Sequence, residues 1–211
     1  MTATTPEPIE LAEFDQDDPA ARGEAHGELW RRPIRELCEI RGALALAKGS
    51  FRDRGELAAI AGLHLPLLAE FSPPLYAELL GIARGAGVTP EQAVILNHYT
   101  DLRDVPRSVL DVPVLQDMPK APGDDPGGCT AIYVPGDGGG PVLGQTWDMH
   151  GTARPYVRLM RLRPRGGDQE LLCFTLTGCL GMTGLSADGV GVTINNLSST
   201  DGQVGVVWPA L

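Results

Sequence analysis

A cysteine that follows two glycines is the residue in this chain best suited to do chemistry. Gly127, Gly128 and Cys129 end a stretch rich in Pro, Asp and Gly, and the residues after Cys129 have the pattern of a strand. A thiol after an unhindered glycyl carbonyl can attack the preceding peptide bond to give a thioester, which water then cleaves. The product would begin with Cys129, whose α-amino group (reference pKa about 7.7–8.0) could act as a general base. The alternative is a small, buried strand residue, as free cysteines often are.

Three polar residues further along the chain could assist such a thiol. Asp148 could hold an ammonium group or a catalytic water, or it could cap backbone amides in a turn. The Asn195 amide could stabilise an oxyanion, or Asn195 could be a turn residue. His150 permits a Cys–His pair with Cys129, although a surface or turn histidine is the simpler interpretation.

Other candidates have plainer explanations. A cluster of arginines could hold the phosphates or carboxylate of an acyl donor, or it could form the solvated face of a strand: Arg154, Arg158, Arg161, Arg163 and Arg165. The glycines at 136–140 precede a strand rather than a helix, which argues against a phosphate-binding loop. Cys38 and Cys173 are predicted core residues, and Cys179 could be either core or functional.

Composition sets the class of protein that carries these residues. The chain has 211 residues, room for one large domain or two small ones, and its 43% hydrophobic and 21% charged residues are typical of a folded protein. The net charge of −10 argues against nucleic-acid partners and anionic membranes. The four cysteines and four histidines lack metal-site or disulfide spacing, so no metal or cofactor is expected.

The N-terminus is strongly acidic. Six Asp or Glu and no Lys or Arg lie between Met1 and Asp18, which predicts a disordered acidic tail over residues 1–20. This start has neither the basic residues nor the apolar stretch of a signal peptide. The uncharged, largely apolar stretch at residues 57–69 is too short for a membrane span. We therefore expect a soluble, cytoplasmic protein.

Two halves of the chain differ in periodicity, which predicts an α+β fold. Apolar residues recur at helical spacing over 21–104, where four helices are expected. The third should begin at Pro73 or Pro74 and stop in the glycines before Val88. The fourth should begin at Thr89, with a capping box to Gln92.

The second half has the period of strands. Five prolines in residues 105–128 indicate a linker. From 129 to 211 the period becomes two, with a hairpin of 130–134 and 142–146 and further β-rich segments at 156–163, 171–177 and 189–195. We expect a mostly antiparallel sheet there.

Several motifs together resemble one family. They are GCT at 128–130, GQTWD at 144–148, GLSADGVGVTINNL at 184–197, RGEAHG at 22–27, LGIARGAGV at 80–88 and LN at 96–97. In order and spacing this set is similar to the acyl-coenzyme A:6-aminopenicillanic acid acyltransferase family, or C45 peptidase family. Its members are self-cleaving N-terminal-nucleophile (Ntn) hydrolases. The resemblance covers the chain from about Ala21 to its last residue.

The resemblance implies a fold and a chemistry. Residues 129–211 would belong to an αββα sandwich, and the precursor, a zymogen, would cleave itself between Gly128 and Cys129. Cys129 would be the nucleophile, with Asp148 near its amino group and Asn195 toward the oxyanion or substrate. The enzyme would transfer an acyl group from a small-molecule amide or acyl-CoA-like thioester to water or an amine, without cofactor. Its two cleaved chains would form a heterodimer.

One departure from the family leaves alternatives open. Family members continue past the position of Asn195 through further helices and strands, whereas this chain stops at Leu211, so we expect a sandwich truncated at its C-terminus. The chain could then be a non-catalytic homologue that acts in binding or assembly. A Cys–His peptidase using Cys129 and His150 is the other alternative.

Overall fold

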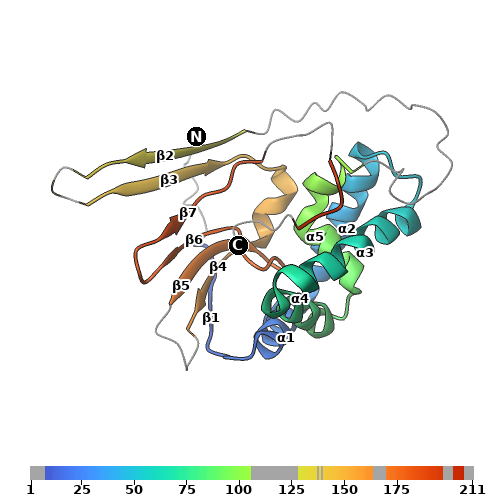
Figure 1. Cartoon of the computed structure of the whole chain (residues 1–211), viewed down its shortest axis with the longest axis horizontal. Helices are drawn as coiled ribbons and strands as arrows, with labels where there is room; N and C mark the ends of the chain where they lie inside the picture. The colour runs from blue at the N-terminus through green and yellow to red at the C-terminus, as the bar shows by residue number, and fades with distance from the viewer. Residues whose placement is uncertain are drawn as a thin grey trace, which may run out of the picture.

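The computed structural model describes residues 8–105, 128–136, 138, 140–163, 170–196 and 202–206. It has the expected α+β composition, with the helices gathered on one side of the molecule and the strands on the other (Figure 1). The helices are α1 (Pro19–Leu29), α2 (Arg31–Lys48), α3 (Arg54–Phe71), α4 (Pro73–Ala86) and α5 (Pro90–Leu102). The strands are β1 (Leu11–Phe14), β2 (Cys129–Val134), β3 (Val142–Trp147), β4 (Val157–Leu162), β5 (Leu171–Leu176), β6 (Thr183–Ser186) and β7 (Gly191–Val192). A short 3-10 helix, η2 (Gly151–Tyr156), precedes β4.

Local signals place the later helices where they were predicted. α4 begins at Pro73 and is capped at its C-terminal end by Gly87, whose φ of 67° is the left-handed conformation that favours glycine. Thr89 caps α5 and forms the complete capping box with Gln92. The first predicted helix is instead two, because the backbone of Trp30 (φ −114°, ψ 33°) leaves the helical region between α1 and α2.

α1 and α4 pack with their backbones almost in contact. Gly23 and Gly27 of α1 face Gly81 and Gly85 of α4, and a Cβ atom added at any of the four would overlap backbone atoms of the opposite helix. Arg22 and Glu78 join the same two helices through a largely buried ion pair of 2.6 Å. The motifs RGEAHG and LGIARGAGV therefore share one structural role, because each supplies two of the four glycines that allow α1 and α4 to pack closely.

The main sheet has the order β1-β4-β5-β6-β7. β1 runs parallel to β4, with Leu11 opposite Leu159, and the other neighbours are antiparallel. The prediction of a disordered acidic tail is thus wrong for residues 8–20, while residues 1–7 lie outside the described residues. This segment forms a strand because its side chains alternate between the core and the solvent. Ala12 and Phe14 are buried, whereas Glu13 faces outward and pairs with Arg161.

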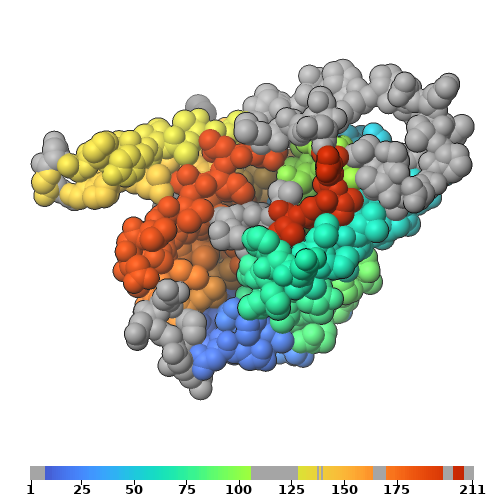
Figure 2. All heavy atoms as spheres, in the orientation of Figure 1, coloured from blue at the N-terminus to red at the C-terminus, as the bar shows by residue number. Residues whose placement is uncertain are grey.

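The predicted hairpin is confirmed, and it forms a sheet of its own. β2 and β3 pair from Cys129 opposite Trp147 to Val134 opposite Val142. Neither strand contributes a fully buried side chain, and the hairpin projects from the rest of the molecule (Figure 2). The buried core lies instead among the five helices and strands β1, β4 and β5 of the main sheet. The predicted linker falls almost wholly on residues 106–127, outside the described residues.

Candidate active site

The Gly128–Cys129 junction lies beside the carboxylate of Asp148. Cys129 is the first residue of β2 and pairs with Trp147, so the next residue, Asp148, comes level with Gly128. A Cβ atom added to Gly128 would stand 4.0 Å from Asp148 Oδ2. Cys129 is a half-buried free thiol, whereas Asp148 and Gly128 are exposed. The structure thus brings together the predicted nucleophile, the predicted cleavage bond and the predicted acid.

Cys129 shares a face of the hairpin with three side chains of β3. Residues directly opposite in an antiparallel pair point to the same side, so Cys129 shares its face with Trp147, and with Gln145 and Leu143 at the alternate positions of β3. Each of these three contacts the part of the chain that follows β4. The Trp147 ring meets Phe174 edge-on with 5.5 Å between centroids, Gln145 bonds Ile194, and Leu143 occupies the space where Gly191 has no side chain.

A large apolar groove opens on this face of the hairpin. It has a volume of about 940 Å³ and lies between β3 and the main sheet. Its lining includes Tyr133, Leu143, Trp147, Leu172, Phe174 and Leu185. The face that carries Cys129 therefore borders space suited to an apolar group rather than to an ion.

Asn195 lies near this face but not in a strand. The predicted β-rich segment 189–195 is strand only over Gly191–Val192, so the expectation that Asn195 sits in a strand is wrong. Its side chain is exposed, as a substrate-contacting amide would be. The preceding residue, Ile194, is bound through its backbone by the side chain of Gln145. Sequence reasoning missed Gln145, although it stands inside the GQTWD motif.

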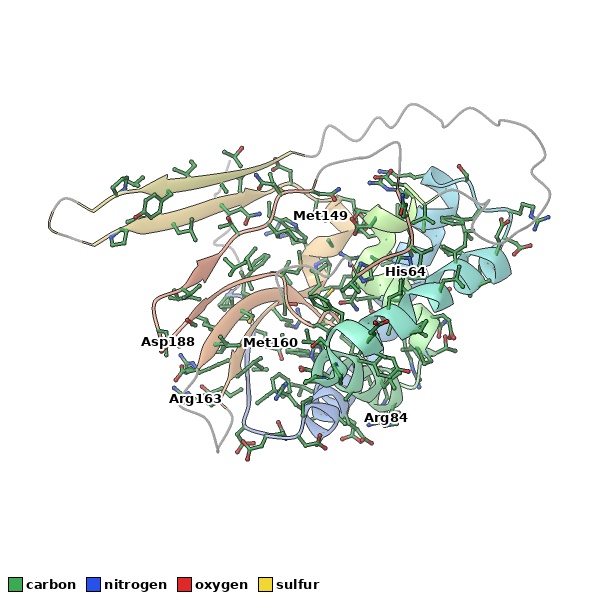
Figure 3. The ribbon with its side chains drawn as sticks, in the orientation of Figure 1. His64, Arg84, Met149, Met160, Arg163 and Asp188 are labelled. Atoms are coloured by element: carbon green, nitrogen blue, oxygen red, sulfur yellow. The ribbon has the colours of Figure 1, made fainter. Side chains whose placement is uncertain are left out.

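His150 is directed toward α5. Its Nδ1 contacts Thr152 Oγ1, and its ring packs edge-on against Tyr99, with 5.5 Å between centroids. The Tyr99 hydroxyl in turn donates to Met149 Sδ at 3.0 Å. Met149 lies where the end of the hairpin meets the helices (Figure 3). These contacts join the segment after Asp148 to α5.

The arginine cluster belongs to another part of the molecule. Arg158 pairs with Glu10 and Arg161 with Glu13, on the two sides of the β1–β4 ladder. Arg163 pairs with Glu170 at 2.9 Å and lies at the opposite end of the strands from Met149 (Figure 3). The interpretation as the solvated face of a strand therefore fits Arg161 and Arg163, whereas Arg158 lies on the other side of β4 with its side chain only 14% exposed. Arg165 lies outside the described residues.

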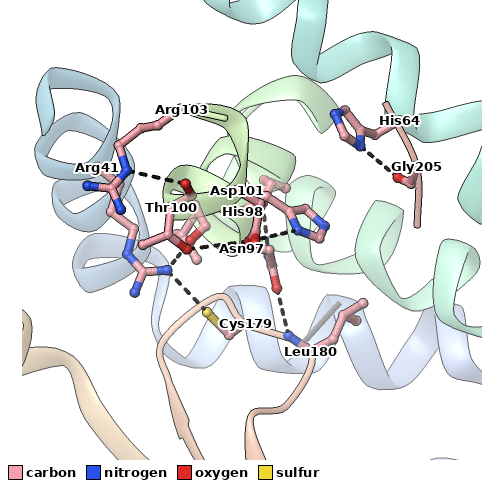
Figure 4. A network of polar contacts seen from close by, with 12 residues as sticks. Arg41, His64, Asn97, His98, Thr100, Asp101, Arg103, Cys179, Leu180 and Gly205 are labelled. Atoms are coloured by element: carbon pink, nitrogen blue, oxygen red, sulfur yellow. Dashed lines mark hydrogen bonds and ion pairs between the residues drawn. The ribbon is translucent and has the colours of Figure 1, made fainter. Parts of the chain in front are cut away.

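Helical residues converge on the turn that follows β5. His26 Nε2 accepts a hydrogen bond from Gly178 N at 2.9 Å, so its ring is neutral, and burial lowers its pKa to about 3. The Asn97 amide donates to Gly178 O at 3.0 Å and accepts from Leu180 N at 3.1 Å (Figure 4). The histidine of RGEAHG and the asparagine of LN thus fix the same turn, a role that their positions in the sequence did not reveal.

The other three cysteines are poor nucleophiles. Burial raises the pKa of Cys38 to about 12, and it also raises the pKa of Cys173 and of Cys179. Arg41 contacts Cys179 Sγ at 3.7 Å and opposes this effect without cancelling it. Since a thiolate is the reactive form, these three thiols are unreactive near neutral pH. Cys38 and Cys179 are core residues, and Cys173 is partly buried against the core.

Within the part of the chain that the structure describes, no group of three or more His, Cys, Asp or Glu side chains could hold a metal ion. No helix among the described residues is both long enough and apolar enough to cross a membrane.

No protein-family model matches the chain, and no curated protein is detectably similar to it. The assignment of function therefore depends on the geometry around Cys129 and on the motifs themselves.

Proposed function

We propose that this chain is the precursor of an Ntn-type cysteine amide hydrolase or acyltransferase that cleaves itself between Gly128 and Cys129. The observation that carries the proposal is the placement of Asp148 Oδ2 beside Gly128, the residue that precedes the bond that would be cut. The half-buried free thiol of Cys129 supports it, because that thiol is accessible and begins a strand. The αββα sandwich of such enzymes is part of this proposal.

Self-cleavage would use only groups of this chain and water. Cys129 Sγ loses its proton and attacks the Gly128 carbonyl carbon, and the new C–S bond replaces the C–N bond as the departing amine takes up a proton. Water then hydrolyses the thioester to the Gly128 carboxylate and the free thiol of Cys129. The new α-ammonium forms where Asp148 can hold it, because an opposite charge at close range stabilises the charged form.

Turnover would follow from the new N-terminus. The α-amine takes the thiol proton, the thiolate attacks an amide or thioester carbonyl, and the leaving amine or thiol departs with a proton. The acyl-enzyme then passes its acyl group to water or to an amine. The apolar groove on the Cys129 face supplies a place for an apolar acyl portion of the substrate.

Intact-mass measurement of the purified full-length chain under denaturing conditions tests the first step. The parent should give two masses that split before Cys129, and Cys129→Ala should give one uncut mass because it lacks the nucleophile. Asp148→Asn, which keeps the shape but loses the charge, should slow cleavage. A single uncut mass in the parent, with no activity on amides or thioesters, would overturn the proposal in favour of a non-catalytic binding chain.

His150→Ala separates the proposal from a Cys–His peptidase. An Ntn enzyme takes its base from the Cys129 amino group, so cleavage and turnover should survive this change within a few-fold. The packing of His150 against Tyr99 makes thermal unfolding a necessary control. A folded His150→Ala variant without turnover would favour the peptidase.

A further inference from the structure

We propose that Gln145 is a positioning residue that holds Asn195 in place beside the Cys129 face of the hairpin. This inference rests on the proposed function and adds to it a residue that acts through another. Its basis is a pair of hydrogen bonds between one side chain and one backbone position, 49 residues apart in the chain.

The two bonds form a clamp on Ile194. Gln145 Oε1 accepts from Ile194 N at 2.9 Å, and Gln145 Nε2 donates to Ile194 O. β7 ends at Val192, so Ile194 lies beyond the paired part of that strand. The Gln145 amide gives Ile194 the donor and acceptor that a neighbouring strand would otherwise supply.

The clamp also fixes where Asn195 can be. Gln145 is two residues before Trp147 and therefore points to the same side of β3 as the residue opposite Cys129. Asn195 directly follows the clamped residue, so its backbone is held along this edge of β3. An oxyanion donor must be held in place before the charge develops, because reorganisation during the reaction removes its advantage.

The chemistry of the clamp requires a primary amide. Glutamine can donate and accept at the same time, whereas an ionised glutamate only accepts and would repel the Ile194 carbonyl. A protonated glutamic acid again has one donor and one acceptor. Methionine has a similar length but cannot form this pair of bonds. These differences allow the bonding to be separated from the packing.

A double-mutant cycle tests whether Gln145 acts through Asn195. Asn195→Ala should lower kcat by about 10²–10³-fold, the usual loss of an oxyanion-hole donor. Gln145→Met should lower kcat by about tenfold with little change in KM, because the donor becomes misplaced rather than lost. The double variant should be no slower than Asn195→Ala within about twofold. Losses that multiply would show independent roles and would overturn the inference.

The pH profile of Gln145→Glu gives a second readout. Its kcat, expressed as a ratio to the parent at each pH, should rise as the pH falls through the carboxyl pKa, because protonation restores the missing donor. Gln145→Met should show a flat ratio. A flat ratio for Gln145→Glu would contradict the clamp.

Amide hydrogen exchange at Ile194 measures the clamp without any substrate. Gln145→Met should speed exchange there by about tenfold, the equivalent of roughly 1.4 kcal/mol of lost protection. Thr146→Ala is the matched control, since Thr146 points to the other face, where its Oγ1 accepts from Thr130 N. This control should leave Ile194 exchange and kcat unchanged.

The two proposals fail in different ways. A parent that neither cleaves itself nor turns over substrate overturns the proposed function, and with it the positioning role of Gln145 in catalysis. An active parent in which Gln145→Met leaves kcat and Ile194 exchange unchanged overturns the positioning role alone.

Discussion

The helical half and the β2–β3 hairpin differ in how they are stabilised: the first by close packing in a buried core, the second mainly by hydrogen bonds between its own strands. α1 and α4 meet backbone to backbone through four glycines, and their neighbours bury the core around them. The hairpin has an intact ladder between its own strands but no fully buried side chain. It contacts the rest of the molecule largely through Leu143, Gln145 and Trp147 of one face. The candidate chemistry thus lies in the region with the least packing, and its position depends on a few side chains.

Gly85→Ala should produce the largest loss of stability. Its Cβ would overlap the backbone oxygen of Glu24, and backbone at a helix contact cannot move aside without separating α1 from α4. We expect a loss of about 3 kcal/mol or more in the free energy of unfolding, measured by urea denaturation. Gly42→Ala is the matched control, because nothing lies within 4 Å of its added Cβ. It should gain about 0.5–1 kcal/mol from helix propensity, and equal losses in both variants would contradict close packing as the cause.

Acid should weaken the helical half through its buried histidines. The pKa of His26 falls from an unfolded value of 6.5 to about 3, and burial also lowers the pKa of His64 and of His98. The unfolded chain therefore binds more protons, so this contribution is complete above pH 6.5 and is lost as the pH falls toward 3. His26 alone should account for about 3 kcal/mol between pH 7 and pH 4.

His26→Gln provides the control for this pH dependence. Its side-chain oxygen can still accept from Gly178 N, but it does not titrate in this range. Unfolding free energies measured at both pH values should show a smaller difference in the variant than in the parent. The same acid loss in both chains would mean that other groups cause it.

Val134→Thr on the hairpin should have the smallest effect. Its side chain is 52% exposed on the face that points away from the main sheet, so little apolar area is lost. We expect a change within about 0.5 kcal/mol in the same urea experiment, as for other exposed positions. A loss of more than about 1 kcal/mol would show that this face is covered in solution.

Local chemistry made much of this fold predictable. The start of α4 at Pro73, the capping box of Thr89 and Gln92, and the hairpin around the glycines after Val134 are all signals within a few residues of one another. The proximity of Cys129 and Asp148 could also be predicted, because the pairing of two antiparallel strands brings the start of one beside the end of the other.

Contacts between residues far apart in the sequence could not be predicted from the sequence alone. The segment that forms β1 was predicted to be a charged tail, because the arginines that pair with Glu10 and Glu13 lie about 150 residues later, on β4. The alternation of Leu11, Ala12, Glu13 and Phe14 was the only local signal, and it spans four residues. Gln145 was missed for the same reason, since its partner is a backbone position that no motif identifies.

In a chain cut before Cys129, the parallel pairing of β1 with β4 would join the two fragments. β1 would belong to one fragment and β4 to the other, while Glu10 and Glu13 of the first would remain bound to arginines of the second. His26 and Asn97 would also reach across the cut to the turn at Gly178. The two fragments would behave as a complementation pair that shares one sheet, separating under denaturing conditions but migrating as a single particle in native buffer.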